Sequence, residues 1–103
     1  MAYQSRLQNE ETDRLFQAVL SLRDQEECYR FFEDICTIHE IQSLAQRLMV
    51  AQMLKSHRTY HEIVEKTSAS TATISRVKRA LEYGADGYRL ILDRLEKTEG
   101  PDA

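Results

Sequence analysis

Small polar residues followed by cations occupy positions 70 to 79, and their side chains share an affinity for nucleic acid. They are Ser70, Thr71, Ala72, Thr73, Ser75, Arg76, Lys78 and Arg79. Hydroxyl groups hydrogen-bond to the edges of several bases, and the methyl groups of Thr and Ala contact thymine. Guanidinium and ammonium groups bind phosphate. On one helix, this combination is typical of a surface that lies in the major groove of DNA.

Residues 60 to 79 have the outline of a helix-turn-helix, two short amphipathic helices joined by a turn of small residues. The apolar positions where the helices would cross are Ile63, Ala69, Ile74 and Val77. Thr67 is a poorer core residue than an aliphatic one. Ser68 stands where many such turns have glycine, so it is strained if the backbone there is left-handed. Tyr60 and His61 begin the first helix and complete the predicted DNA-binding set.

The charge distribution supports this interpretation. Basic and acidic side chains number 14 and 17 overall, but residues 41–80 hold seven basic and two acidic ones, whereas both ends are acidic. A positive middle suits a face presented to a polyanion, and we expect Lys55, Arg58 and Lys66 to be available for phosphate as well. Two alternatives remain open: chance clustering on solvated helices, and a dimeric helical protein-interaction module whose positive middle meets an acidic partner.

Capping signals divide the chain into helices. A Ser, Thr or Asp followed three residues later by an acidic or amide residue is typical of a helix start. The pairs are Ser5 with Gln8, Asp24 with Glu27, Thr37 with Glu40, and Thr59 with Glu62. The third helix should reach about Ser56, and its apolar residues cover more than one face, so we expect burial on several sides. Further helices should begin at about Thr71 and after Asp86, and a left-handed Gly84 should end the first of these.

Length and composition bound the class of protein. The 103 residues are 42% apolar and 30% charged and include three Gly and one Pro. This indicates an all-α fold, with one domain over 1–98 and a flexible tail over 99–103. So small a core leaves no room for a deep enclosed active site, and His39 has no Ser or Cys nucleophile at a recognisable spacing, so we expect no enzyme. Neither a membrane-spanning run nor an apolar signal segment is present, which predicts a cytoplasmic protein.

The histidines and cysteines give weaker signals. His57 and His61 lie four residues apart, a spacing that would suit one metal ion if a single helix held both. The capping signal at Thr59 interrupts that helix, so we predict no metal site and no cofactor. Cys28 and Cys36 form no CxxC motif, which fits a reducing compartment.

From Cys36 to Gly84 the chain reads CTIHEIQSLAQRLMVAQMLKSHRTYHEIVEKTSASTATISRVKRALEYG. The stretch resembles the Trp repressor family, and within it the Trp repressor-related YerC/YecD subgroup, most strongly in EIQSLAQR and ASTATISR. The resemblance implies a six-helix, intertwined homodimer in which the first helices wrap the partner and two short helices read DNA. It also implies a sequence-specific transcriptional repressor that binds a palindromic operator.

The ligand site of this family matches the chain only in part. Two arginines that flank the indole of a bound tryptophan match Arg47 and Arg76, and a threonine matches Thr37. The glycine that leaves space for the ring is Val77 here, and a serine that meets the polar end of the ligand is Ala80. A branched side chain removes volume that the indole needs, and the missing hydroxyl leaves a charged group less well paired. We therefore expect no tryptophan corepressor, and structural or phosphate-contacting roles for the two arginines.

Overall fold

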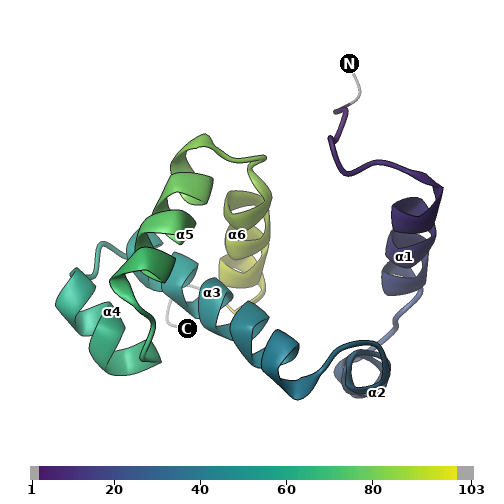
Figure 1. Cartoon of the computed structure of the whole chain (residues 1–103), viewed down its shortest axis with the longest axis horizontal. Helices are drawn as coiled ribbons and strands as arrows, with labels where there is room; N and C mark the ends of the chain where they lie inside the picture. The colour runs from purple at the N-terminus through teal and green to yellow at the C-terminus, as the bar shows by residue number, and fades with distance from the viewer. Residues whose placement is uncertain (1–2, 100–103) are drawn as a thin grey trace. The chain divides into compact units, whose positions relative to one another are not determined.

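The protein is all-α, as predicted. The computed structural model describes residues 3–99, which form six helices and no strand (Figure 1). The helices are α1 (Glu10–Leu20), α2 (Gln25–Ile35), α3 (Ile38–Lys55), α4 (Tyr60–Thr67), α5 (Thr71–Tyr83) and α6 (Gly87–Glu99). The chain divides into two compact units, one ending at Thr37 and the other beginning at Ile38. Within the described range, no helix is both long and apolar enough to cross a membrane.

The first unit contains α1 and α2, which are amphipathic and bury no residue fully. In Figure 1, α1 is seen from the side and α2 end-on, so their axes point in different directions. Phe31 and Phe32 of α2 pack edge to face, with ring centroids 5.3 Å apart. Apolar side chains nevertheless stay in water, including Phe16 at 52% exposure and Leu20 at 84%. These faces are available to a further partner.

The start of α1 differs from the prediction. Asn9, and not Ser5, is the N-cap, and its side chain accepts a hydrogen bond of 2.8 Å from the Thr12 N–H. Ser5 instead forms a turn, in which its hydroxyl accepts from the Leu7 N–H and its carbonyl from the Gln8 N–H. The reason is electrostatic, because the acidic residues that stabilise the positive end of a helix come directly after Asn9. They are Glu10, Glu11 and Asp13.

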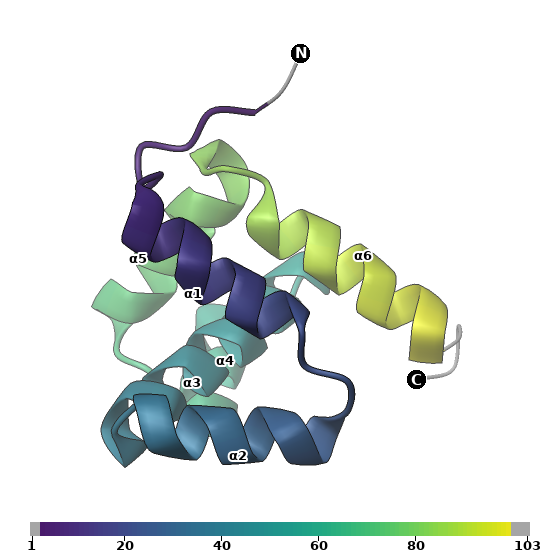
Figure 2. The same ribbon diagram turned by 90° about the vertical axis from the view of Figure 1, so that its right-hand side faces the viewer.

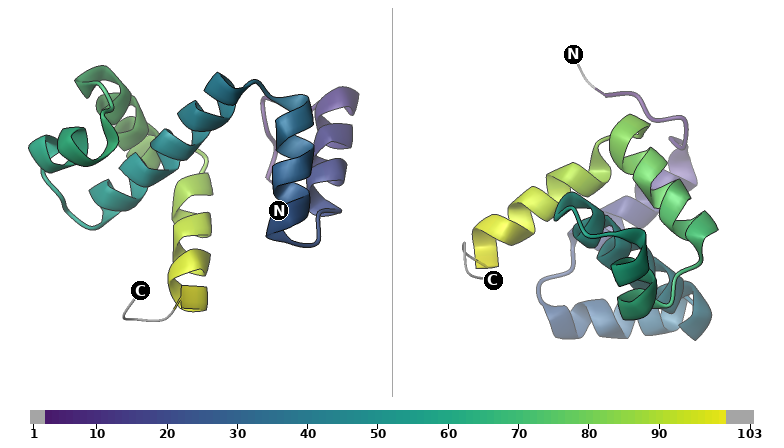
Figure 3. Two further views of the ribbon diagram at one scale, coloured as in Figure 1. Left: turned by 90° about the horizontal axis from the view of Figure 1, so that it is seen from below. Right: turned by 90° about the vertical axis from the view of Figure 1, so that its left-hand side faces the viewer.

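The second unit is built around α3, which packs against α4, α5 and α6. In the left view of Figure 3, α4 and α5 lie on one side of α3 and α6 on the other. Figure 2 shows the short loop by which α5 turns into α6. The buried core of this unit consists of Val50, Ala51, Ile63, Ala69, Ile74, Val77 and Leu92. Burial of each large aliphatic side chain contributes roughly 1.5–3 kcal/mol, so this cluster fixes how the four helices cross.

The expected burial of α3 on several sides is not reached by its contacts with α4, α5 and α6 among the described residues. Only Val50 and Ala51 of this helix are fully buried. Ile38 is 79% exposed, and Leu44 and Met49 are also exposed. Among residues 38–99, nothing fully covers the remaining apolar faces of α3.

Helix ends in the second unit follow local chemistry. Thr59 and Glu62 form the predicted capping box at the start of α4, and Asp24 caps α2 in the first unit as expected. Gly84 ends α5, but its φ of −85° is not left-handed, so that prediction was wrong. Glycine is required there for another reason. An added Cβ would lie 2.3 Å from the Ala80 carbonyl oxygen, which real side chains do not tolerate.

Ion pairs join α3 to α6. Lys55 donates hydrogen bonds to Asp93 and, at 3.3 Å, to Glu96. The bond between Lys55 and Asp93 raises the pKa of the lysine and lowers the pKa of the aspartate. Glu99 belongs to α6, so the first residue of the predicted tail is helical, and the rest of that tail, residues 100–103, lies outside the described residues.

The capping box predicts a loss of stability in acid. Hydrogen bonds from the backbone and hydroxyl of Thr59 lower the pKa of Glu62. Because the folded pKa lies below the unfolded one, the stability gained is present above about pH 4 and is lost as pH falls further. Thermal melts between pH 7 and pH 3 should show a smaller acid-side fall for Glu62→Gln than for the wild type. Glu82→Gln, exposed on α5 and without an ion pair among residues 3–99, is the control. Equal slopes for Glu62→Gln and the wild type would contradict the assignment.

Candidate nucleic-acid interface

The surface predicted to meet DNA is built on α4, a three-residue turn and α5. The capping box sets the first turn of α4, since the Glu62 N–H donates to the Thr59 hydroxyl at 3.1 Å and the Thr59 N–H donates to the Glu62 carboxylate at 2.9 Å. Ile63 and Ile74 are fully buried, one on each helix. They hold the two helices together, so the outward face of α5 is rigidly placed.

The turn between the helices contains a strained serine. Ser68 has φ 59° and ψ 16°, which is the left-handed conformation, and its N–H donates to the Val64 carbonyl. The predicted cost of a serine at this position is therefore present. A residue with a Cβ is less stable than glycine in this conformation by roughly 1–2 kcal/mol.

Thr67 stabilises the same turn and is more than a poor core residue. Its hydroxyl donates to the Ile63 carbonyl at 2.7 Å and accepts from the Ala69 N–H at 3.1 Å. From α3, the Gln46 amide donates to the Thr67 carbonyl at 3.0 Å. An aliphatic side chain at 67 would lose the first two of these bonds. The turn is thus fixed from within and from α3.

The first turn of α5 separates capping residues from exposed ones. The Ser70 hydroxyl accepts from the Thr73 N–H and donates to the Thr73 hydroxyl, both at 3.1 Å. Thr73 is half-buried, whereas Thr71, Ala72 and Ser75 are exposed. Ser70 therefore orders the helix start, and the exposed small side chains are the ones free to reach a base edge.

Three cations of α5 are without ion pairs among the described residues. Arg76, Lys78 and Arg79 are exposed, and within the described residues they make no ion pair or side-chain hydrogen bond. Two other predicted phosphate ligands are not free in this way. Lys55 is paired with Asp93 and Glu96, and Arg58 with Glu62 at 3.1 Å. Lys55 lies far from Asp93 and Glu96 in the sequence, so the packing of α6 against α3 that pairs them could not be predicted from spacing. Lys66 is exposed on α4.

Tyr60 and His61 occupy the first turn of α4. Both are exposed, and His61 lies 3.3 Å from Glu65, one turn further along the helix. His57 precedes this helix in the loop after α3, so His57 and His61 do not share a helix. The predicted binding of Tyr60 and His61 to DNA stays a prediction.

Arg47 and Arg76, the two arginines that the family resemblance assigns to a ligand site, line one cleft. A depression of about 360 Å³ lies between α3 and α5, and both Arg47 and Arg76 contribute to its wall. Arg47 also bonds weakly to the carbonyl and hydroxyl of Ser43, one turn earlier on α3, at 3.4 and 3.5 Å. Thr37 is exposed directly before α3, and its place in a ligand site stays a prediction.

Val77 and Ala80 belong to the same cleft. Val77 is only 2% exposed and is part of the buried core, so its branched side chain fills space that a glycine would leave empty. Sequence reasoning missed that Thr73, Gln46 and Tyr88 also line the cleft. Tyr88 comes from α6, so its presence depends on how α6 packs on α3, which periodicity alone does not reveal.

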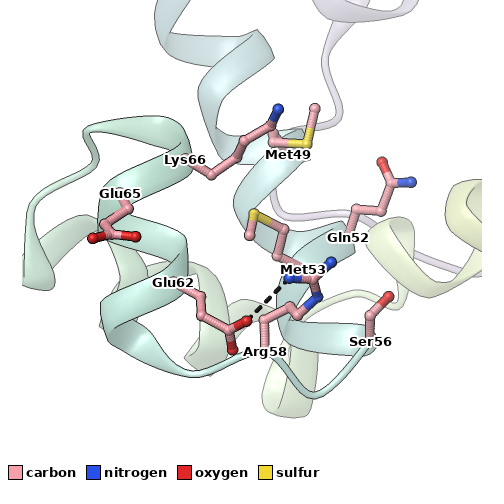
Figure 4. A pocket seen from close by; sticks show the side chains of 8 residues that line it. All are labelled: Met49, Gln52, Met53, Ser56, Arg58, Glu62, Glu65 and Lys66. Carbon is pink, nitrogen blue, oxygen red and sulfur yellow. Dashed lines mark hydrogen bonds and ion pairs between the residues drawn. The ribbon is translucent and has the colours of Figure 1, made fainter.

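A second groove lies between α3 and α4, where Figure 4 shows both polar and apolar side chains. Its volume is about 610 Å³, and the dashed line marks the ion pair between Arg58 and Glu62. Met49 and Met53 line the α3 side of the groove, and Lys66 lines the α4 side. Polar and apolar groups both line it, and Arg58 and Glu62 are already paired with each other.

Comparison with known proteins agrees with this architecture. The family model "Trp repressor protein" matches residues 10–96. The uncharacterized protein YerC of Bacillus subtilis (strain 168) is 63% identical over 94 residues, which cover 91% of this chain and 90% of YerC. A crystal structure of a candidate Trp repressor from Staphylococcus aureus has a TM-score of 0.84 at 56% identity, covering 87% of this chain and 90% of that one. A TrpR-like protein from Eubacterium eligens ATCC 27750 has a TM-score of 0.85 at 60% identity, covering 87% and 93%.

The fold and the exposed α5 surface define a helix-turn-helix protein. The chain belongs to the Trp repressor family, in the subgroup related to YerC. The resemblance read from the sequence motifs is thereby confirmed.

The strained turn gives a direct test of the local geometry. Ser68→Gly should stabilise the protein by about 1 kcal/mol, because glycine adopts the left-handed conformation without a Cβ penalty. For a domain of this size, that raises Tm by roughly 4–8 °C. Ser68→Ala, which keeps the Cβ, is the control and should gain little. Equal Tm values for the glycine and alanine variants would mean that residue 68 is not left-handed.

Proposed function

We propose that this protein is a sequence-specific DNA-binding transcriptional regulator, a repressor that binds a palindromic operator as a homodimer in the cytoplasm. The observation that carries the proposal is the outward face of α5, which presents exposed small polar side chains and three cations without ion pairs among residues 3–99. Membership of the Trp repressor family supports it. We propose no catalytic activity and no cofactor.

The proposed DNA contacts follow from position along α5. Thr71, Ala72 and Ser75 are exposed near the start of the helix, the part that reaches base edges in the major groove. Lys78 and Arg79 are exposed further along and bind phosphates, as do Tyr60 and His61 at the start of α4. Short hydroxyl side chains discriminate bases modestly, so bridging water carries part of the specificity.

Dimerisation accounts for the uncovered apolar faces. Two amphipathic helices without a fully buried residue, together with Ile38 and Leu44 exposed on α3, leave apolar side chains in water, and large exposed apolar patches are typical of interaction surfaces. A second copy of the chain covers them in the proposed dimer. The arrangement also supplies two copies of α5, which a palindromic site requires.

A protein-interaction module is the second candidate function. The same exposed apolar faces favour it, because they would equally serve an unrelated partner. DNA binding distinguishes the two candidate functions. Only the first predicts binding that falls steeply with salt and also prefers one sequence over bulk duplex.

Light scattering at low micromolar concentration should give about twice the mass of one chain. Phe16→Glu should lower this mass or the melting temperature, because it places a charge in the proposed apolar interface. Gln17→Glu, at the next position of α1, introduces the same charge on a polar side chain and is the matched control. A folded wild-type monomer at this concentration would rule out the proposed dimer.

Fluorescence anisotropy with duplex DNA should separate the base-reading residues of α5 from the phosphate-binding ones. Arg79→Gln should weaken binding to all sequences alike and reduce the salt slope by about 0.9 for each phosphate that the protein no longer neutralises. Thr71→Ala should instead change the preferred sequence while the slope stays the same. Arg94→Gln on α6 controls for the removal of an exposed cation. If Thr71→Ala and Arg79→Gln behave alike, α5 is not the reading helix.

Tryptophan should not act as a corepressor, because Val77 and Ala80 line the cleft where its ring and polar end would lie. Titration calorimetry should show no saturable binding, and DNA affinity should not respond to the free amino acid. The double variant Val77→Gly with Ala80→Ser should gain binding, with circular dichroism as the check on its fold. A micromolar isotherm for the wild type would show that the cleft adapts to the ring.

A further inference from the structure

A separate cleft of about 760 Å³ lies where α3, α4, α5 and α6 meet. His57 of the loop after α3, Tyr60 of α4, Lys78 of α5 and Arg89 of α6 all line it. The volume lies in the range of small-ligand sites. None of the roles assigned above to α5 explains why donors from four segments face one space.

The side chains that line this cleft carry a net positive charge once their ion pairs are counted. Lys55 and Asp93 also line it but neutralise each other in an ion pair. Lys78 keeps its charge unpaired within the described part of the chain. Arg89 donates through Nε to the Leu81 carbonyl at 2.9 Å, which anchors the guanidinium and leaves its terminal nitrogens available.

Two further charged residues line the cleft, Arg58 and Glu82. Arg58 is paired with Glu62. Glu82 supplies one negative charge to the wall and makes no ion pair among residues 3–99. Two free cations against one free carboxylate leave a net positive site, and the phenol of Tyr60 adds a neutral donor.

His57 stands at this cleft in a conformation that favours glycine. Its φ is 60°. Its N–H donates to the Leu54 carbonyl and the Arg58 N–H donates to the Met53 carbonyl, which is the hydrogen-bond pattern of a Schellman helix end. A side chain is costly there, and within the described residues this imidazole makes no hydrogen bond. The helix end accounts for this conformation, and the imidazole that it places at the cleft is a hydrogen-bonding group without a partner among residues 3–99.

We propose that this cleft binds a phosphate group, with Lys78 and Arg89 supplying charge and His57 and Tyr60 supplying further donors. Two sources carry that group: the backbone of duplex DNA beside the site read by α5, or a free phosphorylated small molecule. The first source rests on the proposed DNA-binding function, and the second does not. Glu82 weakens the site by like-charge repulsion and sets its affinity.

Titration of the full-length protein with inorganic pyrophosphate, followed by NMR shifts of the His57 and Tyr60 rings, tests the free source. Saturable shifts should appear, and Lys78→Gln should weaken binding about tenfold or more, as expected for one charge-assisted hydrogen bond. Glu82→Gln should tighten it about fivefold. Arg94→Gln, on α6 outside the cleft, is the control.

Duplex binding tests the other source. Lys78→Gln and Arg89→Gln should each reduce the salt slope by about 0.9 without changing the preferred sequence. His57→Gly separates function from folding, because it should raise Tm by roughly 4–8 °C while weakening phosphate binding.

The site is supported by a saturable pyrophosphate response that the cleft variants weaken, or by duplex binding whose salt slope falls in Arg89→Gln as well as in Lys78→Gln. If the wild type binds no DNA, the proposed function fails and the pyrophosphate titration alone decides. The proposal is overturned if pyrophosphate gives no saturable shifts and the cleft variants bind duplex as the wild type does.

Discussion

The apolar packing among α3, α4 and α5 determines where every exposed group of α5 lies. Ile63, Ile74 and Val50 of α3 are fully buried in it. Because the core is small, each member contributes a large share of the packing energy. The turn adds a second constraint, since Thr67 and Gln46 fix its backbone through hydrogen bonds. A rigid α5 can then present its small polar and cationic side chains in one orientation.

Some side chains of α5 are exposed to solvent, and others line the cleft between α3 and α5. Thr71 and Arg79 are exposed, whereas Thr73 and Val77 face the cleft with Arg47. A ligand in this cleft would contact α5 through Thr73, Arg76 and Val77. Val77 already fills part of that space from within the core, which is why we propose a regulator that holds its reading helix in place without tryptophan.

Sequence patterns predicted most of the local structure and less of the long-range packing. The capping box at Thr59 and the cap at Asp24 depend on residues three apart, so the sequence displays them directly. Ser5 carried the same signal, but the helix begins at Asn9, which is followed by more acidic residues. The pairing of Lys55 with α6 and the entry of Tyr88 into the α5 cleft depend on helix packing. No spacing rule reveals such neighbours.

Selection of bound duplexes from a random pool tests most directly whether two copies of α5 read DNA together. A symmetric dimer should enrich one palindromic sequence, whose half-sites lie about 34–36 Å apart or a multiple of that distance. Binding to this sequence should fall steeply with salt. Recovery of a single asymmetric half-site, or of no preferred sequence at all, would contradict joint reading by two α5 helices.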